Sequence, residues 1–116
     1  MKANKNLYDI GGRLALVTGG GGVLGFNMAK YLARQGSRIV LLDINADQAS
    51  RNAEEIIAAG GEAVAFKLDV LARADVEAMA EKIESEFGVI DILINAVGGN
   101  VEGSTILNAI PIPAIR

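Results

Sequence analysis

The residues that most suggest chemistry are glycines in the segment Thr18–Gly25, which reads TGGGGVLG and directly follows the apolar run Leu14–Val17. Gly20, Gly22 and Gly25 satisfy the spacing G-x-G-x-x-G. This spacing allows a tight turn, a close approach of the backbone to a diphosphate, and a helix whose free N–H groups attract that anion. The segment predicts a phosphate site, with a ligand-free glycine turn as the alternative. The candidate binding residues are Gly19, Gly20, Gly22, Val23, Leu24 and Gly25.

A carboxylate stands at the end of the second apolar run, Ile39–Leu42. Asp43 lies near the offset of about 20 residues from the glycines at which an acidic side chain meets an adenosine ribose. A carboxylate there would accept hydrogen bonds from both ribose hydroxyls and repel a 2′-phosphate, so Asp43, with Ile44 beside it, predicts NAD(H) rather than NADP(H). Neither Arg38 nor Arg51 lies at the tip of this strand, where it could receive such a phosphate. The alternative is that Asp43 only caps the following helix or turn.

Apolar runs alternate with helical periodicities along the chain, which is typical of βαβ units and a parallel sheet. The expected strands are Leu14–Thr18, Arg38–Asp43, Glu62–Lys67 and Ile90–Asn95. The expected helices are Val23–Gln35, Ala46–Ala59 and Arg73–Phe87. The predicted fold is α/β, a partial Rossmann-type doubly wound parallel sheet of about four strands in the order 3-2-1-4. Right-handed crossovers then put the first two helices on one face and the third on the other.

Each expected helix carries an apolar stripe that predicts its buried face. In the first helix the stripe is Leu24, Met28, Tyr31 and Leu32. In the second it is Ala49, Ala53, Ile56 and Ile57. In the third it is Val76, Met79, Ala80, Ile83 and Phe87.

These residues resemble the short-chain dehydrogenases/reductases, whose hallmark is T-G-x-x-x-G-x-G followed later by N-N-A-G. Thr18, Gly19 and Gly25 match the first element, while Val23 replaces its middle glycine and Gly22 stands one position earlier. The resemblance covers about residues 11–99. Within the family, the glycine loop and the run Gly98-Gly99-Asn100 are similar to sugar-acid oxidoreductases of the D-mannonate oxidoreductase type.

The resemblance implies further cofactor contacts. Asp69 would bond the adenine amino group and Val70 would pack on the ring, unless Asp69 merely caps a turn. Asn95 matches the N-N-A-G element and would stabilise the sheet and line the cofactor cleft, unless it only ends a strand. Ala96 and Val97, which depart from the motif, would lie beside it.

The family's reaction transfers hydride between the nicotinamide and a carbonyl or secondary alcohol, with a Tyr-x-x-x-Lys pair and an upstream serine. Tyr8 is followed four residues on by Gly12 and Tyr31 by Gln35, so neither forms the pair. Ser104 follows too soon after the fourth strand. We therefore predict no catalytic residue in this chain. Two other hypotheses are a non-catalytic NAD-binding module and a flavodoxin-like interaction domain that binds no dinucleotide.

Composition narrows the classes of protein and of binding partner that remain possible. The 116 residues are 51% hydrophobic and 22% charged, which is typical of one globular domain. The net charge of −3 and the absence of a basic cluster argue against nucleic acid and membrane partners. Without histidine or cysteine the chain lacks the common zinc ligands, so no metal site is expected. No apolar run suits a membrane span or a signal peptide, and we expect a cytoplasmic protein.

The chain is expected to divide into a dinucleotide-binding half, 1–99, and an extended or disordered tail, 100–116. Pro111 and Pro113 make a helix in the tail implausible. These 116 residues do not include the second half of a Rossmann sheet, so the fourth strand should be an exposed edge of this chain. We expect a homo-oligomer, a covering partner segment, or a longer enzyme of which this chain is a fragment.

Overall fold

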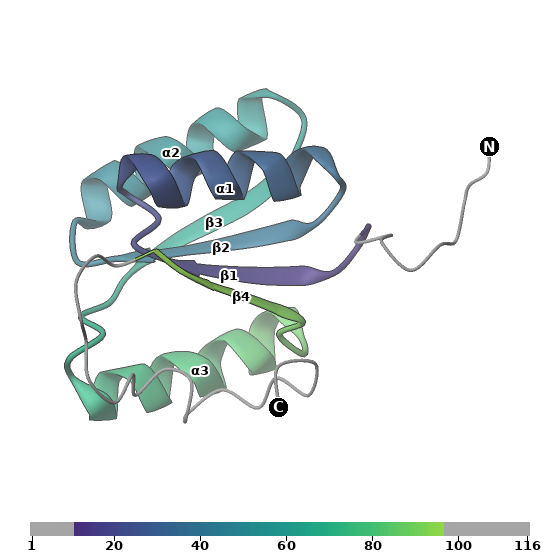
Figure 1. The fold of residues 1–116 in the computed structure, drawn as a ribbon. Coiled ribbons are helices and arrows are strands. Elements are labelled where there is room, and N and C mark those ends of the chain that lie inside the picture. The colour runs from purple at the N-terminus through teal and green to yellow at the C-terminus, as the bar shows by residue number, and fades with distance from the viewer. Residues whose placement is uncertain (1–10, 97–116) are drawn as a thin grey trace.

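The computed structural model describes residues 11–96. They form a four-stranded sheet in the order β3-β2-β1-β4, with α1 and α2 on one face and α3 on the other (Figure 1). The elements are β1 Leu14–Thr18, α1 Val23–Arg34, β2 Arg38–Asp43, α2 Ala46–Ala58, β3 Glu62–Lys67, α3 Arg73–Phe87 and β4 Ile92–Asn95. Every strand pair is parallel. The predicted Rossmann-type sheet and its order are confirmed, while the expected tail lies outside the described residues.

The element limits differ from the expected ones at three ends. We expected the first helix to end at Gln35 and the second at Ala59. Both residues are instead the C-caps of their helices, α1 and α2. The fourth strand does not span Ile90–Asn95 but begins at Ile92. The reason is Asp91, whose carboxylate accepts the Leu14 N–H at 3.0 Å in place of a strand carbonyl.

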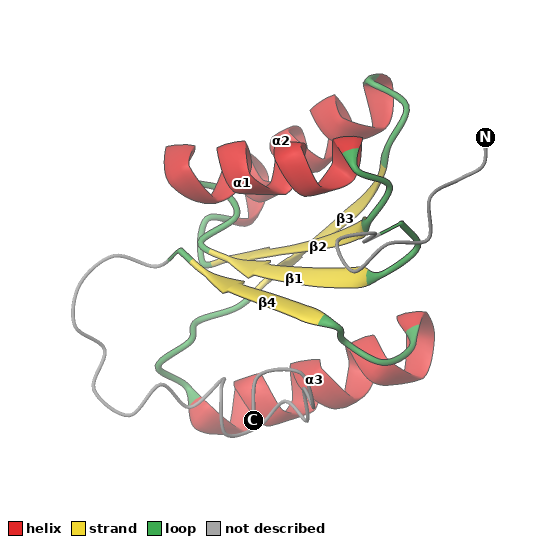
Figure 2. Cartoon of the chain, turned by 45° about the vertical axis from the view of Figure 1, so that its right-hand side comes forward, coloured by secondary structure: helices red, strands yellow, loops and turns green. Residues whose placement is uncertain are grey.

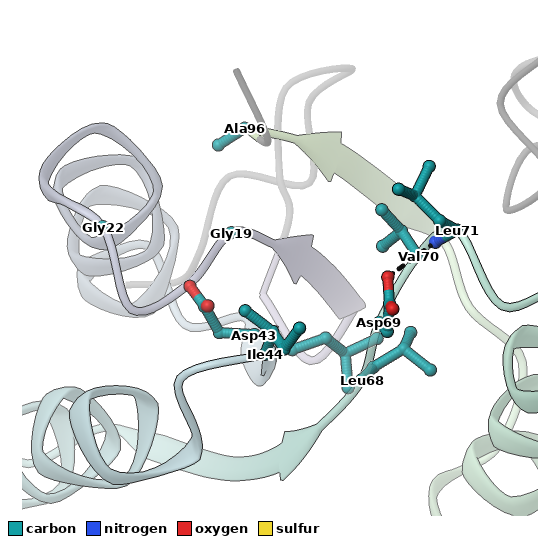
Figure 3. Close-up of a pocket in the computed structure, with 10 residues that line it drawn as sticks. Gly19, Gly22, Asp43, Ile44, Leu68, Asp69, Val70, Leu71 and Ala96 are labelled. Carbon is teal, nitrogen blue, oxygen red and sulfur yellow. Dashed lines mark hydrogen bonds between the residues drawn. The ribbon is translucent and has the colours of Figure 1, made fainter. Parts of the chain in front are cut away.

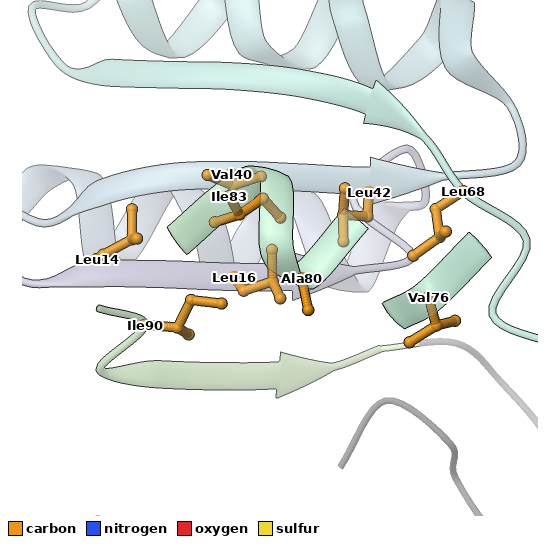
Figure 4. Close-up of a cluster of buried hydrophobic side chains, with 9 residues drawn as sticks. All are labelled: Leu14, Leu16, Val40, Leu42, Leu68, Val76, Ala80, Ile83 and Ile90. Atoms are coloured by element: carbon orange, nitrogen blue, oxygen red, sulfur yellow. The ribbon is translucent and has the colours of Figure 1, made fainter. Parts of the chain in front are cut away.

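The sheet divides the core into two layers, which Figure 2 shows as helices above and below the strands. Successive residues of a strand point to opposite faces, so Leu16 packs toward α3 while Val17 packs toward α1 and α2. The layer next to α3, drawn in Figure 4, is Leu14, Leu16, Val40, Leu42, Leu68, Val76, Ala80, Ile83 and Ile90. The other layer is Ala15, Val17, Ala29, Ile39, Leu41, Ala49, Ala53 and Ile56. Burial on both faces explains why β1 and β2 are continuous apolar runs.

α1 turns a different face to the sheet from the one expected. Leu24, Met28 and Tyr31 are 63%, 37% and 58% exposed, so the predicted buried stripe is wrong at these positions, whereas Leu32 is half-buried against the core. The helix instead buries Gly25 and Ala29. These small residues let the helix approach the sheet and the glycine loop closely, which a stripe of large side chains would prevent.

The stripes of α2 and α3 do pack against the sheet, with one exception. Ile57 is 53% exposed, because its neighbour Ile56 occupies the buried side of the helix at 3% exposure. Met79 and Phe87 of α3 are half-buried against the core. None of the helices in residues 11–96 combines the length and apolar character of a membrane span.

Candidate functional site

A cavity of about 430 Å³ lies at the carboxyl ends of the strands (Figure 3). Its wall is made by the loops that follow β1 and β3, by the end of β2 with the next residue, Ile44, and by the residue after β4. The lining residues are Gly19, Gly22, Leu42, Asp43, Ile44, Leu68, Asp69, Val70, Leu71 and Ala96. In a parallel α/β sheet this edge is where ligands bind.

The cavity brings together most of the predicted cofactor residues. Seven of them line it, namely Gly19, Gly22, Asp43, Ile44, Asp69, Val70 and Ala96. Five others do not line it, namely Gly20, Val23, Leu24, Gly25 and Asn95. Val97 lies outside the described residues. Sequence reasoning missed Leu42, Leu68 and Leu71, although each is adjacent to, or within two positions of, a predicted aspartate at a strand end.

Two glycines of the loop are required by the fold itself. Gly19 adopts φ +71°, a left-handed conformation that side chains rarely tolerate, and its carbonyl accepts the Gly22 N–H at 3.0 Å. A Cβ at Gly25 would collide with the carbonyl oxygen of Gly19. Gly19 therefore makes the tight turn, and Gly25 makes the close packing between helix and loop.

Gly20 and Gly21 lie in close contact with β2. A Cβ at Gly20 would lie 2.8 Å from the Cβ of Leu41, and one at Gly21 would lie 2.8 Å from Oδ2 of Asp43. The Gly20 contact lies close to the Leu41 backbone, so a side chain there would force β2 or the loop to move. At Gly21 the contact is with the end of the Asp43 side chain, so a side chain there would turn the carboxylate away.

Gly22 differs from the other four, because nothing in the fold requires a glycine there. It is the N-cap of α1 with φ −86° and ψ 171°, which any residue adopts, and an added Cβ would meet only the Gly19 carbonyl at 3.5 Å. Glycine is common at N-caps, but Ser, Asp and Asn cap a helix somewhat better because their side chains accept an N–H of the first turn. α1 nevertheless has no side-chain cap and no acidic residue in its first turn. Gly22 therefore leaves the positive end of α1 open toward the cavity, where an anion fits.

Asp43 is held between two backbone donors. Its Oδ2 accepts the Gly21 N–H at 2.8 Å and its Oδ1 accepts the Asn45 N–H at 2.9 Å. Asn45, not Asp43, caps α2 by accepting the Gln48 N–H at 3.1 Å. Asp43 thus caps a turn but not the helix. Each of its oxygens keeps a lone pair for a further donor such as a ribose hydroxyl.

The two arginines considered as phosphate ligands are engaged elsewhere. Arg38 begins β2, at the end opposite Asp43, and donates to the Phe87 carbonyl at 2.9 Å. Arg51 donates to the Gln48 side chain at 2.9 Å. The cavity lining therefore carries two carboxylates and no cation among the described residues.

Asp69 and Asn95 both have structural partners. Oδ1 of Asp69 accepts the Leu71 N–H at 3.0 Å, so this carboxylate caps a turn and also lines the cavity. Oδ1 of Asn95 accepts the hydroxyl of Thr18 at 2.7 Å, and Thr18 is fully buried. Asn95 thereby ties β4 to β1 just below the cavity rather than lining it.

This arrangement suits a nucleotide. Leucine and valine side chains offer an apolar surface for a base, Asp43 offers acceptors for a sugar diol, and the start of α1 offers donors for a phosphate. Within residues 11–96 no group of three or more His, Cys, Asp or Glu residues is placed to hold a metal ion.

Comparison with known proteins supplies relatives for this geometry. An uncharacterized oxidoreductase of Bacillus subtilis, UxuB, is 44% identical over 92 residues, which cover 79% of this chain and 33% of the relative. The 7alpha-hydroxysteroid dehydrogenase of Escherichia coli is 35% identical over 96 residues, covering 83% of this chain and 38% of the relative. The chain thus spans about a third of the length of the curated relatives it matches.

Solved structures agree with the sequence relatives. A Haemophilus influenzae structure described as a D-mannonate oxidoreductase with bound NAD has a TM-score of 0.74 and 42% identity, covering 80% of this chain and 33% of that one. The Escherichia coli hydroxysteroid dehydrogenase has a TM-score of 0.74 and 37% identity, covering 78% and 38%. The family model for short chain dehydrogenase matches residues 13–110. With that match over most of its length, the chain belongs to the short chain dehydrogenase family.

Proposed function

We propose that this chain binds NAD(H) in the cavity at the strand ends and is the cofactor-binding part of a short-chain dehydrogenase/reductase. The bound nicotinamide would exchange hydride with a carbonyl or secondary alcohol. The observation that carries the proposal is Gly22, because it leaves a helix N-terminus uncapped beside a cavity when the fold would accept a capping side chain. Glycine stabilises the helix slightly less than a capping side chain would, and it leaves the N–H groups of the first turn available to an anion.

Each part of the cavity has a role in this proposal. The α1 N-terminus next to Gly22 holds the diphosphate, Asp43 accepts the adenosine ribose hydroxyls, and Asp69 and Val70 contact the adenine. Ile44, Ala96 and Val97 would complete the contacts. NAD(H) is favoured over NADP(H) because a 2′-phosphate beside Asp43 would find a carboxylate and no cation in the described lining.

The test compares two variants of nearly equal size, Gly22→Asp and Gly22→Asn, by NADH titration followed through NADH fluorescence. A like charge about 4 Å from the diphosphate costs several kcal/mol at an effective dielectric constant of about 20, so Gly22→Asp should weaken binding by about 100-fold or more. Gly22→Asn should weaken it less, through crowding alone. Both variants should melt at or above the parent temperature without NADH, because both are better N-caps than glycine. A Gly22→Asp chain that binds NADH as tightly as the parent contradicts the proposal.

A non-catalytic NAD-binding module is the second candidate. It is favoured by the absence of a Tyr-x-x-x-Lys pair from the 116 residues. The chain by itself is then expected to bind NADH without oxidising it in the presence of any carbonyl compound. Absorbance at the NADH band, followed with a panel of aldehydes, ketones and keto acids, tests this expectation, and oxidation of NADH by these 116 residues would overturn the second candidate.

A sugar acid is the substrate class we propose for the whole enzyme. Support comes from the 42% identity to the structure described as a D-mannonate oxidoreductase and the 33% identity to a 5-keto-D-gluconate 5-reductase of Escherichia coli. We also propose that the whole enzyme is a homo-oligomer and that it is located in the cytoplasm. The edge position of β4 within the described sheet supports association with further chain.

A further inference from the structure

The peptide group between Gly20 and Gly21 is held at both of its ends. Its carbonyl, on Gly20, accepts the side-chain amide N–H of Asn52 at 2.8 Å. Its N–H, on Gly21, donates to Oδ2 of Asp43 at 2.8 Å. One partner comes from α2 and the other from the end of β2, so a single peptide plane is fixed between two elements.

This peptide needs such support more than others do. It is flanked by glycines on both sides, and glycine loses more conformational freedom on ordering than any other residue. A flip of the peptide would turn the Gly20 carbonyl toward the Asp43 carboxylate and remove the donor that orients it. The conformation of the loop and the orientation of the carboxylate therefore depend on the same peptide.

Asn52 is an unexpected residue at its position. It is 5% exposed, whereas the other buried residues of α2 are apolar, namely Ala49, Ala53 and Ile56. A buried amide is costly unless it is hydrogen-bonded, and Asn is a poorer helix former than Ala or Leu. Packing of α2 alone would favour an apolar residue here.

The orientation of the Asn52 amide is itself determined by a neighbour. Its Oδ1 accepts the side-chain N–H of Gln48 at 2.9 Å, which leaves Nδ2 directed at Gly20. Oε1 of Gln48 in turn accepts an N–H of Arg51 at 2.9 Å. A chain of hydrogen bonds thus leads from the exposed side of α2 to the glycine loop, and such chains strengthen their members.

We propose that Asn52 is a positioning residue of the nucleotide site, which keeps the Gly20–Gly21 peptide in the orientation that presents Asp43 and the loop to NAD(H). That the ligand is NAD(H) rests on the proposed function. The two hydrogen bonds that hold the Gly20–Gly21 peptide, called the clamp below, do not depend on it. Loss of the clamp lowers the fraction of molecules with a binding-competent loop, and the apparent affinity falls by that fraction.

The test replaces Asn52 by an apolar residue of similar size, Asn52→Leu, with Ile56→Val as a matched control on the same buried face of α2. The first readout is hydrogen exchange of the Gly21 amide by NMR, without any ligand. The second is NADH affinity, measured well below the melting temperature. Asn52→Leu should speed Gly21 exchange and weaken NADH binding, each by about tenfold, the ratio that corresponds to about 1.4 kcal/mol. Ile56→Val should change neither, even though it removes core volume.

The outcomes separate the two proposals. If the hydrogen-exchange rate of the Gly21 amide is unchanged in Asn52→Leu, Asn52 does not hold the peptide, and this conclusion does not depend on the NADH affinity. Faster exchange with unchanged NADH affinity, in a parent chain that binds NADH, overturns the positioning role. A parent chain that does not bind NADH contradicts the proposed function, and the exchange measurement still decides the clamp. If Ile56→Val changes Gly21 exchange and NADH affinity as much as Asn52→Leu does, Asn52 only stabilises α2 in general. That result would also overturn the inference.

Discussion

The cavity has two walls that are built in different ways. The loop after β1 consists of glycines, and besides its one local bond from the Gly22 N–H to the Gly19 carbonyl it takes its position from other elements, through Leu42, Asp43 and Asn52. The loop after β3 makes its own turn, because Asp69 accepts the N–H of Leu71 through its side chain and that of Ala72 through its carbonyl. A wall made of main chain needs long-range support, whereas a wall made of side chains can support itself locally. Substitutions in the first wall should therefore have larger and more widespread effects than substitutions in the second.

The largest effect is expected where the first wall meets α1. Gly25→Ala would place a Cβ on the Gly19 carbonyl, so the helix or the loop must move. Overpacking of this kind costs about 1–3 kcal/mol, which corresponds to a fall in melting temperature of roughly 4–8 °C per kcal/mol. Asn27→Ala, at an exposed position of the same helix, is the control and should not lower the melting temperature. A Gly25→Ala chain as stable as the control would mean that the close contact is not needed.

An intermediate effect is expected at the junction between the walls. Asp43→Asn keeps an acceptor for one of the two N–H groups but presents an amide N–H₂ to the other, at a cost of about 1 kcal/mol in stability. It also removes the negative charge from the position proposed for the adenosine ribose. The ratio of NADPH to NADH dissociation constants should fall by about tenfold, equivalent to about 1.4 kcal/mol. If this ratio is identical to that of the parent, Asp43 only caps a turn and does not discriminate between the two cofactors.

The smallest effect is expected in the second wall. Asp69→Asn keeps the oxygen that accepts the Leu71 N–H, so its stability in urea should stay within about 0.5 kcal/mol of the parent. Asp69→Ala removes that bond and should lose about 0.5–1.5 kcal/mol. If both variants bind NADH equally, the adenine contact does not need the charge. If Asp69→Asn is as unstable as the glycine-loop variants, the contrast between the two walls is wrong.

Much of the fold could be predicted because its signals are local. Apolar runs of strand length, helical periodicity and the glycine stops give the element order, and the crossover rule gives the sheet order. The face of α1 could not be predicted in this way. Its periodicity points to Leu24 and Tyr31, but the contact that decides the orientation is between Gly25 and the Gly19 carbonyl, and small residues carry little weight in an apolar pattern.

The site was predictable where a motif has a fixed spacing and unpredictable where support comes from a distance. Gly22 and Asp43 follow such a spacing and both line one cavity, whereas Gly20 and Gly25 of the same motif do not line it. Asn52 lies 32 residues from its partner Gly20, and nothing in the sequence of α2 marks one polar residue among several as the buried one. Similarly, the start of β4 depends on the side chain of Asp91 replacing a backbone acceptor, which no strand pattern reveals.

The pairing of β4 with β1 also has a consequence for the order of assembly. The hydrogen bond between Thr18 and Asn95 joins residues 77 positions apart, while the hydrogen bonds of the Gly20–Gly21 peptide come from Asp43 of β2 and Asn52 of α2. Closing a longer loop costs more chain entropy and delays the contact. On the ribosome, a nascent chain that has released α2 already contains every hydrogen-bond partner of the Gly20–Gly21 peptide. The glycine-loop side of the cavity can thus take shape during synthesis, before the strand that completes the cavity has been made.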